Sequence, residues 1–106
     1  MVAMNQIEEF GRRIGTEFQA EKVFLFGSHA AGSATEDSDV DVLVILSYEG
    51  RSVDQSVAIR MKLRPPFPVD LIVRTPEKIV ERLEMGDNFV RDILEQGKVL
   101  YEADNC

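Results

Sequence analysis

Residues 23–46 read VFLFGSHAAGSATEDSDVDVLVIL, and this stretch largely determines the fold. Its first four residues are aliphatic or aromatic and end at Gly27-Ser28, which predicts a short strand at 23–26 with both faces buried. Residues 28–37 are small and polar, which predicts a loop with room for one helical turn. Residues 39–46 read DVDVLVIL and predict a second strand. The link between the two strands is long enough to allow antiparallel pairing.

An amphipathic helix is predicted before the first strand, at about residues 3–20. Apolar residues recur there at spacings of three and four: Ala3, Ile7, Phe10, Ile14 and Phe18. Gly11 and Gly15 lie within this helix, and each weakens it by about 1 kcal/mol relative to alanine. We therefore expect the backbone at these glycines to pack closely against another element.

After the second strand, a helix is predicted to begin at Ser52, with Gln55 completing a capping box. Pro65-Pro66 ends this helix. Three apolar residues lie along one of its faces: Val53, Val57 and Met61. Residues 69–73 predict a third strand, and the helical crossover favours parallel pairing of the second and third strands.

Two more helices and a last strand are predicted in the C-terminal third. Thr75-Pro76 is typical of an N-cap followed by the first helical residue. The residues of this helix that we expect to face inward are Ile79, Val80 and Leu83. Asp87 or Asn88 caps the last helix, which closes at Gly97. The apolar residues of that helix are Phe89, Val90, Ile93 and Leu94. Residues 99–101 predict a short strand.

The predicted order of elements is α-β-β-α-β-α-α-β. This order indicates an α/β domain with a small mixed β-sheet flanked by helices. The sequence contains no internal repeat and no linker-like tract, and 106 residues suit one hydrophobic core. We therefore expect residues 1–106 to form a single domain.

The composition excludes several classes of protein. A hydrophobic content of 44% argues against disorder. The longest apolar run, residues 42–46, is far shorter than the roughly 18 residues of a membrane span. The net charge of −7 argues against direct nucleic-acid binding through general charge attraction. Because the N-terminus carries no secretory signal and Cys106 is the only cysteine, we expect a cytoplasmic protein.

Two aspartates open the second strand, although aspartate is a poor strand former. Asp39 and Asp41 are two residues apart, so their side chains point to the same face, with α-carbons about 6.5–7 Å apart. Carboxylates placed in this way repel each other unless a cation lies between them. They could hold Mg²⁺ together with phosphate oxygens, either as one ion or as two ions about 3.5–4 Å apart. A solvated acidic turn at residues 36–39 is the structural alternative.

A third aspartate, Asp70, interrupts the apolar residues of the third strand. If this strand lies beside the second, Asp70 joins Asp39 and Asp41 at one site. It could then ligate the metal that activates the attacking group, or act as the general base. The sequence therefore predicts three catalytic, metal-binding carboxylates.

The end of the first strand carries residues suited to binding phosphate. Gly27 allows a backbone turn that other residues resist. A strand-to-helix junction exposes unpaired amide hydrogens that bind phosphate, and the Ser28 hydroxyl can donate one more hydrogen bond. His29, the only histidine, either contacts a phosphate or caps the turn. These three residues are the candidate nucleotide-binding residues.

Gly27-Ser28, ten further residues and then Asp39-Val40-Asp41 resemble the GSx10DxD signature of the minimal nucleotidyltransferases of the DNA polymerase β superfamily. The wider stretch at 26–44, FGSHAAGSATEDSDVDVLV, is similar to the sequence usual in that family around this signature. Residues 93–102 resemble its closing helix and strand. The resemblance covers nearly the whole chain and implies a polymerase β-like nucleotidyltransferase fold.

The resemblance also implies an activity, the transfer of a nucleoside monophosphate, usually AMP from ATP, onto an acceptor hydroxyl. Carried over by position, Asp39 and Asp41 would hold Mg²⁺ and Asp70 would complete the triad. Gly27-Ser28 would hold the triphosphate. ATP is then the expected co-substrate and Mg²⁺ the expected cofactor.

Many small members of this family are antitoxins, and their partner is a helical HEPN ribonuclease toxin. The resemblance therefore implies a protein adenylyltransferase that silences its toxin by attaching AMP to a tyrosine. The acceptor would come from a partner protein or another subunit, so we expect a homo- or hetero-oligomer. This sequence departs from the family pattern at His29 and Ala31, where family members often carry arginine. Two alternatives stay open: the catalytic subunit of an aminoglycoside-type nucleotidyltransferase, and an antitoxin that acts by binding alone.

Overall fold

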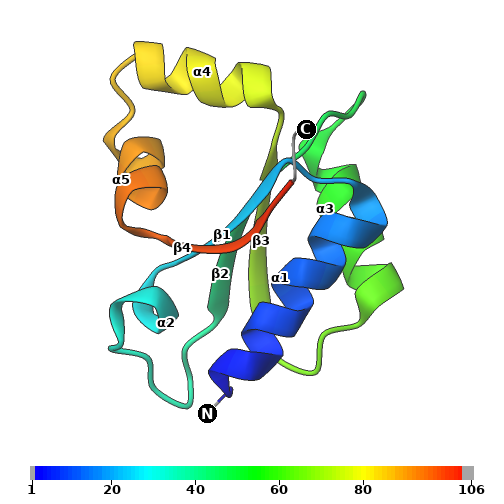
Figure 1. The fold of residues 1–106 in the computed structure, drawn as a ribbon, viewed down its shortest axis with the longest axis vertical. Helices are drawn as coiled ribbons and strands as arrows, with labels where there is room; N and C mark the ends of the chain where they lie inside the picture. The colour runs from blue at the N-terminus through cyan, green and yellow to red at the C-terminus, as the bar shows by residue number, and fades with distance from the viewer. Residues whose placement is uncertain (1, 104–106) are drawn as a thin grey trace.

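The computed structural model describes residues 2–103, and its helices and strands follow the predicted order (Figure 1). They are α1 (Met4–Phe18), β1 (Lys22–Phe26), α2 (Ser28–Ala31), β2 (Val40–Ile45), α3 (Ser52–Leu63), β3 (Val69–Arg74), α4 (Pro76–Glu84), α5 (Asn88–Gln96) and β4 (Lys98–Glu102). The short α2 is the helical turn for which residues 28–37 had room. Cys106 lies outside the described residues. None of the helices within residues 2–103 is long and apolar enough to cross a membrane.

The four strands form one sheet in the order β3-β2-β1-β4. β1 pairs antiparallel with both β2 and β4, whereas β2 and β3 pair in parallel. The mixed sheet and both predicted pairings are therefore confirmed. The parallel pairing follows from α3, which carries the chain back across one face of the sheet between β2 and β3.

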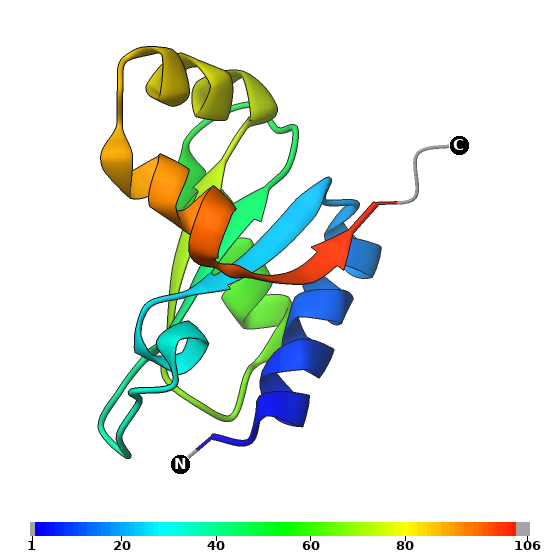
Figure 2. The same ribbon diagram turned by 60° about the vertical axis from the view of Figure 1, so that its left-hand side comes forward.

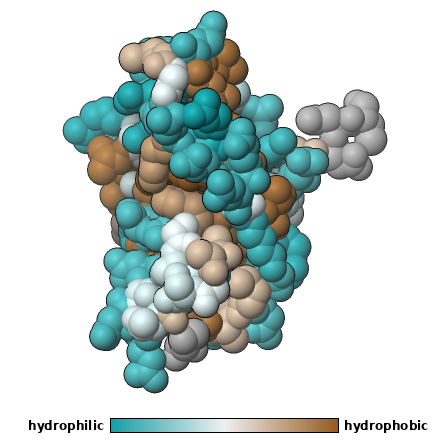
Figure 3. Space-filling view, turned by 90° about the vertical axis from the view of Figure 1, so that its left-hand side faces the viewer, coloured by the Kyte–Doolittle hydropathy of each residue, from teal (hydrophilic) through white to brown (hydrophobic). Residues whose placement is uncertain are grey.

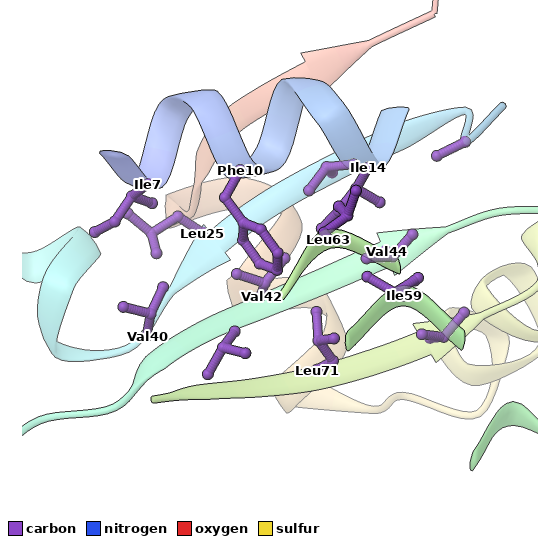
Figure 4. Packing of buried hydrophobic residues seen from close by; sticks show 14 of the residues in the cluster. Ile7, Phe10, Ile14, Leu25, Val40, Val42, Val44, Ile59, Leu63 and Leu71 are labelled. Atoms are coloured by element: carbon purple, nitrogen blue, oxygen red, sulfur yellow. The ribbon is translucent and has the colours of Figure 1, made fainter. Parts of the chain in front are cut away.

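One face of the sheet is sealed by α1 and α3 (Figures 1 and 4). α1 turns Ile7, Phe10 and Ile14 onto this face, and α3 adds Ile59 and Leu63. They pack on alternate strand residues, which are Val23, Leu25, Val40, Val42, Val44, Val69, Leu71 and Val73. Burial of one such side chain contributes about 1.5–3 kcal/mol, so this layer is the main source of stability.

The two glycines of α1 pack against β4, as the sequence predicted. A β-carbon at Gly11 would lie 2.4 Å from the Leu100 side chain, and one at Gly15 would lie 2.2 Å from the Tyr101 ring. Real β-carbons are not found that close to other heavy atoms. The missing side chains therefore let α1 lie directly on the last strand.

The opposite face is covered by α4 and α5, but only toward one end of the strands (Figures 1 and 2). A smaller cluster is buried there: Phe24, Leu43, Ile45, Ile79, Val90 and Ile93. Farther along the same face, β2 and β3 carry Asp41 and Asp70 instead of apolar residues. α2 lies near this uncovered end.

The start of α3 differs from the prediction. Ser52 is already the first helical residue, and the N-cap is Arg51, which makes no side-chain capping hydrogen bond. The predicted capping box is therefore wrong, because Ser52 lies one position too far along the helix to cap it. The face with Val53, Val57 and Met61 is exposed, since Ile59 and Leu63 supply the buried face.

In α4, Ile79 is buried as predicted, but Val80 and Leu83 are 56% and 38% exposed. The inward orientation predicted for these two residues is therefore wrong, because Ile79 is the buried residue of α4 and supplies its contact with the sheet cluster. The predicted caps are confirmed for both C-terminal helices. The Thr75 hydroxyl accepts a hydrogen bond from the Lys78 amide. Asp87 accepts hydrogen bonds from two amides of α5.

Candidate functional site

Three adjacent strands bring the candidate residues into one row. Asp41 in β2 is in register with Asp70 in the parallel strand β3. On its other side, Asp41 is in register with Phe26, the residue that precedes Gly27. Neighbouring strands lie about 4.8 Å apart, so the row runs from the end of β1 through Asp41 to Asp70. The structure thus brings Gly27, Asp41 and Asp70 together at the uncovered end of the sheet.

The carboxylates of this row differ in burial. Asp41 is half-buried, whereas Asp70 and Asp39 are exposed, the latter just before β2. Burial raises the pKa of Asp41 above its ordinary value. The nearby carboxylates of Asp70 and Asp39 raise this pKa further, and His29 opposes the shift. Asp70 and Asp39 are therefore both close enough to Asp41 for their charges to act on its carboxylate.

Gly27 is required where it stands for two reasons. Its φ of +75° is a conformation that side chains disfavour. A β-carbon there would also lie 2.2 Å from Oδ2 of Asp41. Gly27 therefore leaves a space beside the Asp41 carboxylate that any other residue would fill. Ser28 follows directly as the first residue of α2.

His29 is buried, with 7% of its surface exposed. Its Nε2 lies 3.3 Å from the backbone carbonyl of Ser38, next to Asp39. His29 thus ties α2 to the segment that leads into β2, which is the turn-capping role considered from the sequence. Contact between His29 and a phosphate stays a prediction.

The acids suit a hard divalent cation in chemistry, since they offer carboxylate oxygens beside an open glycine turn. The burial of the Asp41 carboxylate and its repulsion by Asp70 and Asp39, which together raise the pKa of Asp41, are what a cation would offset. Within residues 2–103, however, no three His, Cys, Asp or Glu side chains lie close enough together to form a preformed metal-binding site. The ligand roles of Asp39, Asp41 and Asp70 therefore stay predictions.

A cavity of about 330 Å³ opens beside this row, between α2 and α5. It is lined by Phe26, Gly27, Ala30, Ala31, Phe89, Asp92, Ile93, Gln96 and Gly97. α5 was not among the elements that the sequence predicted to contribute to the site. The sequence feature that could have revealed it is the spacing of Phe89, Asp92 and Gln96, which places all three on one face of the helix.

Residues 6–106 match the family described as Polymerase beta, Nucleotidyltransferase. The chain belongs to this family. The mixed sheet with its flanking helices is accordingly the polymerase β-like nucleotidyltransferase fold that the motif predicted, and the chain is a nucleotidyltransferase.

Other proteins share more specific similarity with this nucleotidyltransferase. It is 30% identical over 97 residues to the Methanocaldococcus jannaschii protein named "Putative protein adenylyltransferase MJ0604", which covers 90% of this chain and 94% of the relative. Among solved structures, a "putative nucleotidyltransferase from Sulfolobus solfataricus" has a TM-score of 0.63 at 20% identity, covering 93% of this chain and 79% of that one. A toxin-antitoxin structure with AMP-PNP has a TM-score of 0.56 at 18% identity, covering 97% and 76%. At these identities the two solved structures show the fold alone.

Proposed function

We propose that this nucleotidyltransferase transfers AMP from ATP onto a hydroxyl of a partner protein, as the antitoxin of a toxin–antitoxin pair. The observation that carries the proposal is the row of Gly27, Asp41 and Asp70 across three adjacent strands. The similarity to the M. jannaschii relative supports adenylyl transfer to protein. The fold shared with the toxin-antitoxin structure that contains AMP-PNP supports ATP as donor and a toxin as acceptor.

The residues take separate roles along the row. Gly27 and Ser28 hold the triphosphate, because Gly27 leaves room for it beside Asp41. Asp39, Asp41 and Asp70 would hold Mg²⁺, as one ion or two. When bound, Mg²⁺ would neutralise charge on the triphosphate and on the departing pyrophosphate.

The order of the row fits an in-line displacement. The acceptor oxygen attacks the α-phosphorus, and the bond from that phosphorus to the oxygen shared with the β-phosphorus breaks. Pyrophosphate leaves toward Gly27-Ser28, at the junction between β1 and α2. The acceptor then approaches from the opposite side, where Asp70 lies on the outer strand β3 and can accept the hydroxyl proton. Exposure of Asp70 leaves it accessible to a large acceptor.

The acceptor is proposed to be a tyrosine of a helical HEPN ribonuclease toxin. A single domain of residues 1–106 supplies the catalytic row, and the toxin supplies the hydroxyl, so the active assembly is a hetero-oligomer. The added AMP would silence the toxin.

Intact-mass spectrometry tests this proposal. The purified chain is incubated with ATP, Mg²⁺ and the product of the neighbouring gene. We expect the partner to gain the mass of one or more adenylyl groups. Asp41→Asn and Asp70→Asn should abolish the gain, and Asp54→Asn, an exposed aspartate on α3, should not.

Two outcomes would overturn the proposal in different ways. If the partner gains no adduct and is still neutralised by the Asp41→Asn variant, the chain acts by binding alone. If pyrophosphate is released only when an aminoglycoside is present, the acceptor is a small molecule.

A further inference from the structure

The cavity between α2 and α5 is continuous with the catalytic row. Gly27 lines the cavity and also makes the close approach to Oδ2 of Asp41. Phe26, another lining residue, is the register partner of Asp41. A triphosphate held at Gly27 therefore has this cavity within reach of the rest of the nucleotide. Its volume of about 330 Å³ lies at the lower end of the range for small-molecule sites.

Phe89 gives the cavity an exposed aromatic ring. The side chain is 55% exposed, which is unusual for a phenylalanine. It meets Phe26 edge to face, with ring centroids 5.6 Å apart and planes at 87°. Either Phe89 presents its edge to the Phe26 ring, or it receives the edge of Phe26 on one of its faces. In both arrangements at least one face of the Phe89 ring is not covered by Phe26. A flat heterocycle can stack on that face. Figure 3 looks onto this side of the molecule and shows apolar surface between polar patches.

The charge of the cavity selects which part of a nucleotide can enter. Among residues 2–103, the lining contains one charged residue, Asp92, and no basic residue. A triphosphate would be repelled there, whereas an uncharged base would not. Asp92 is exposed and accepts hydrogen bonds but cannot donate them when ionised. Gln96 lies one turn farther along α5, and its amide can both donate to and accept from adenine.

We infer that this cavity binds the base of the nucleoside triphosphate, with Phe89 as the stacking surface. Asp92 and Gln96 select a purine with an exocyclic amine, adenine, over one with a carbonyl at the same position, hypoxanthine. The inference rests on the proposed nucleotidyl transfer and adds the residues that choose the nucleotide.

Calorimetric titration of the whole chain with Mg²⁺ and without the partner tests the inference. The probes are ATP, ITP and inorganic tripolyphosphate. We expect ATP to bind about tenfold or more tightly than ITP, since ITP would place a carbonyl against the Asp92 carboxylate. ATP should also bind more tightly than tripolyphosphate.

Variants separate stacking from hydrogen bonding. Phe89→Ala should weaken ATP binding by about tenfold and leave tripolyphosphate binding unchanged. Asp92→Asn should reduce or reverse the preference for ATP over ITP, because the new amide can donate to the hypoxanthine carbonyl. The matched controls are Glu95→Gln on α5 and Val80→Ala on α4, both exposed and outside the cavity lining, and they should change neither ratio.

Equal binding of ATP, ITP and tripolyphosphate, with adenylyl transfer intact, would overturn the base site and leave the proposed function standing. Unchanged ATP binding in Phe89→Ala would also overturn it. If none of the three probes binds and no transfer occurs, the proposed function falls and this inference falls with it.

Discussion

The two faces of the sheet are built from the same strands and serve different purposes. The face under α1 and α3 is apolar along its length, from Val40 to Val44 in β2. The face under α4 and α5 is apolar at Leu43 and Ile45 but carries Asp41 at its open end. Alternation along a strand therefore lets one segment, residues 40–45, supply both core residues and Asp41, the central acid of the proposed catalytic row.

A chain of 106 residues can carry a charged site on one face of its sheet because the other face is entirely apolar. Burial of the Asp41 carboxylate, together with its repulsion by Asp70 and Asp39, makes its ionised form reduce the stability of the folded state, as the raised pKa of Asp41 indicates. The apolar face and the close packing of α1 on β4 offset this cost. We therefore expect stability and activity to respond separately to changes on the two faces.

The largest effect is expected on the rate of transfer when the acid row is changed. Asp41→Asn should lower the rate of adenylyl transfer by at least about 100-fold, because a charge that acts on the transferring phosphate is lost. The measurement is the initial rate with the partner protein, alongside a circular-dichroism melt. A loss of activity that is accompanied by unfolding would show that the two faces are not separable.

The next largest effect concerns the sealed face. Leu25→Ala removes a side chain that is 0% exposed and should destabilise the fold by about 2–5 kcal/mol. Leu83→Ala on α4 is the matched control, since this leucine is 38% exposed and should cost less than about 1 kcal/mol. Denaturant titration measures both. Similar losses in the two variants would contradict the assignment of the main core to the α1–α3 face.

A smaller effect, with a change of sign, is expected at the contact between α1 and β4. Gly15→Ala should destabilise the protein by about 1 kcal/mol or more, because the added β-carbon meets the Tyr101 ring. In a Tyr101→Ala background, the same change should stabilise it by up to about 1 kcal/mol, since alanine favours the helix. A double-mutant cycle measures this coupling. A stabilising Gly15→Ala in the natural background would show that the contact is not tight.

The smallest effect is on the stability of the metal-free protein. The pKa of Asp41 is raised in the folded state, so its ionised form destabilises the fold above that pKa, and protonation removes the cost as pH falls. Asp41→Asn should therefore raise the melting temperature slightly at neutral pH, through a gain in the free energy of unfolding of less than about 1 kcal/mol for this partly exposed group. Melts in chelator should show the difference between variant and natural protein shrinking toward acidic pH. A difference that grows instead would contradict a destabilising ionised form of Asp41.

Much of the fold was predictable because a few residues, such as the glycines and the strand aspartates, constrain the local backbone and its neighbours strongly. The apolar strands around Gly27 and the Asp39-Val40-Asp41 motif predicted β1, β2 and the acid row. Gly11 and Gly15 predicted the close approach of α1 to another element, and the parallel partner of β2 followed from the crossover helix.

The errors arose where two patterns competed on one helix. In α3, the stripe from Val53 to Met61 and the pair Ile59 and Leu63 are both compatible with a buried face, and only packing against α1 and β3 selects the second. In α4, Ile79 and Val80 are adjacent and point in different directions from the helix axis, so only Ile79 is buried against the sheet.

The candidate site was predicted in part for a similar reason. Asp39, Asp41 and Asp70 contrast with apolar strands, so their sequence context marks them. Phe89 does not stand out in this way, because an aromatic residue beside Val90 reads as core. Only the three-dimensional structure places Phe89 against Phe26 at the rim of a cavity.

Attack on the α-phosphorus is the central claim, and isotopic labelling tests it most directly. The chain, its partner and Mg²⁺ are incubated with ATP labelled at either the α- or the γ-phosphate. The account predicts that the α-label becomes bound to the partner and that the γ-label is released as pyrophosphate, with neither event in Asp41→Asn. Transfer of the γ-label to the partner, or no labelling of a partner that is nevertheless neutralised, would contradict it.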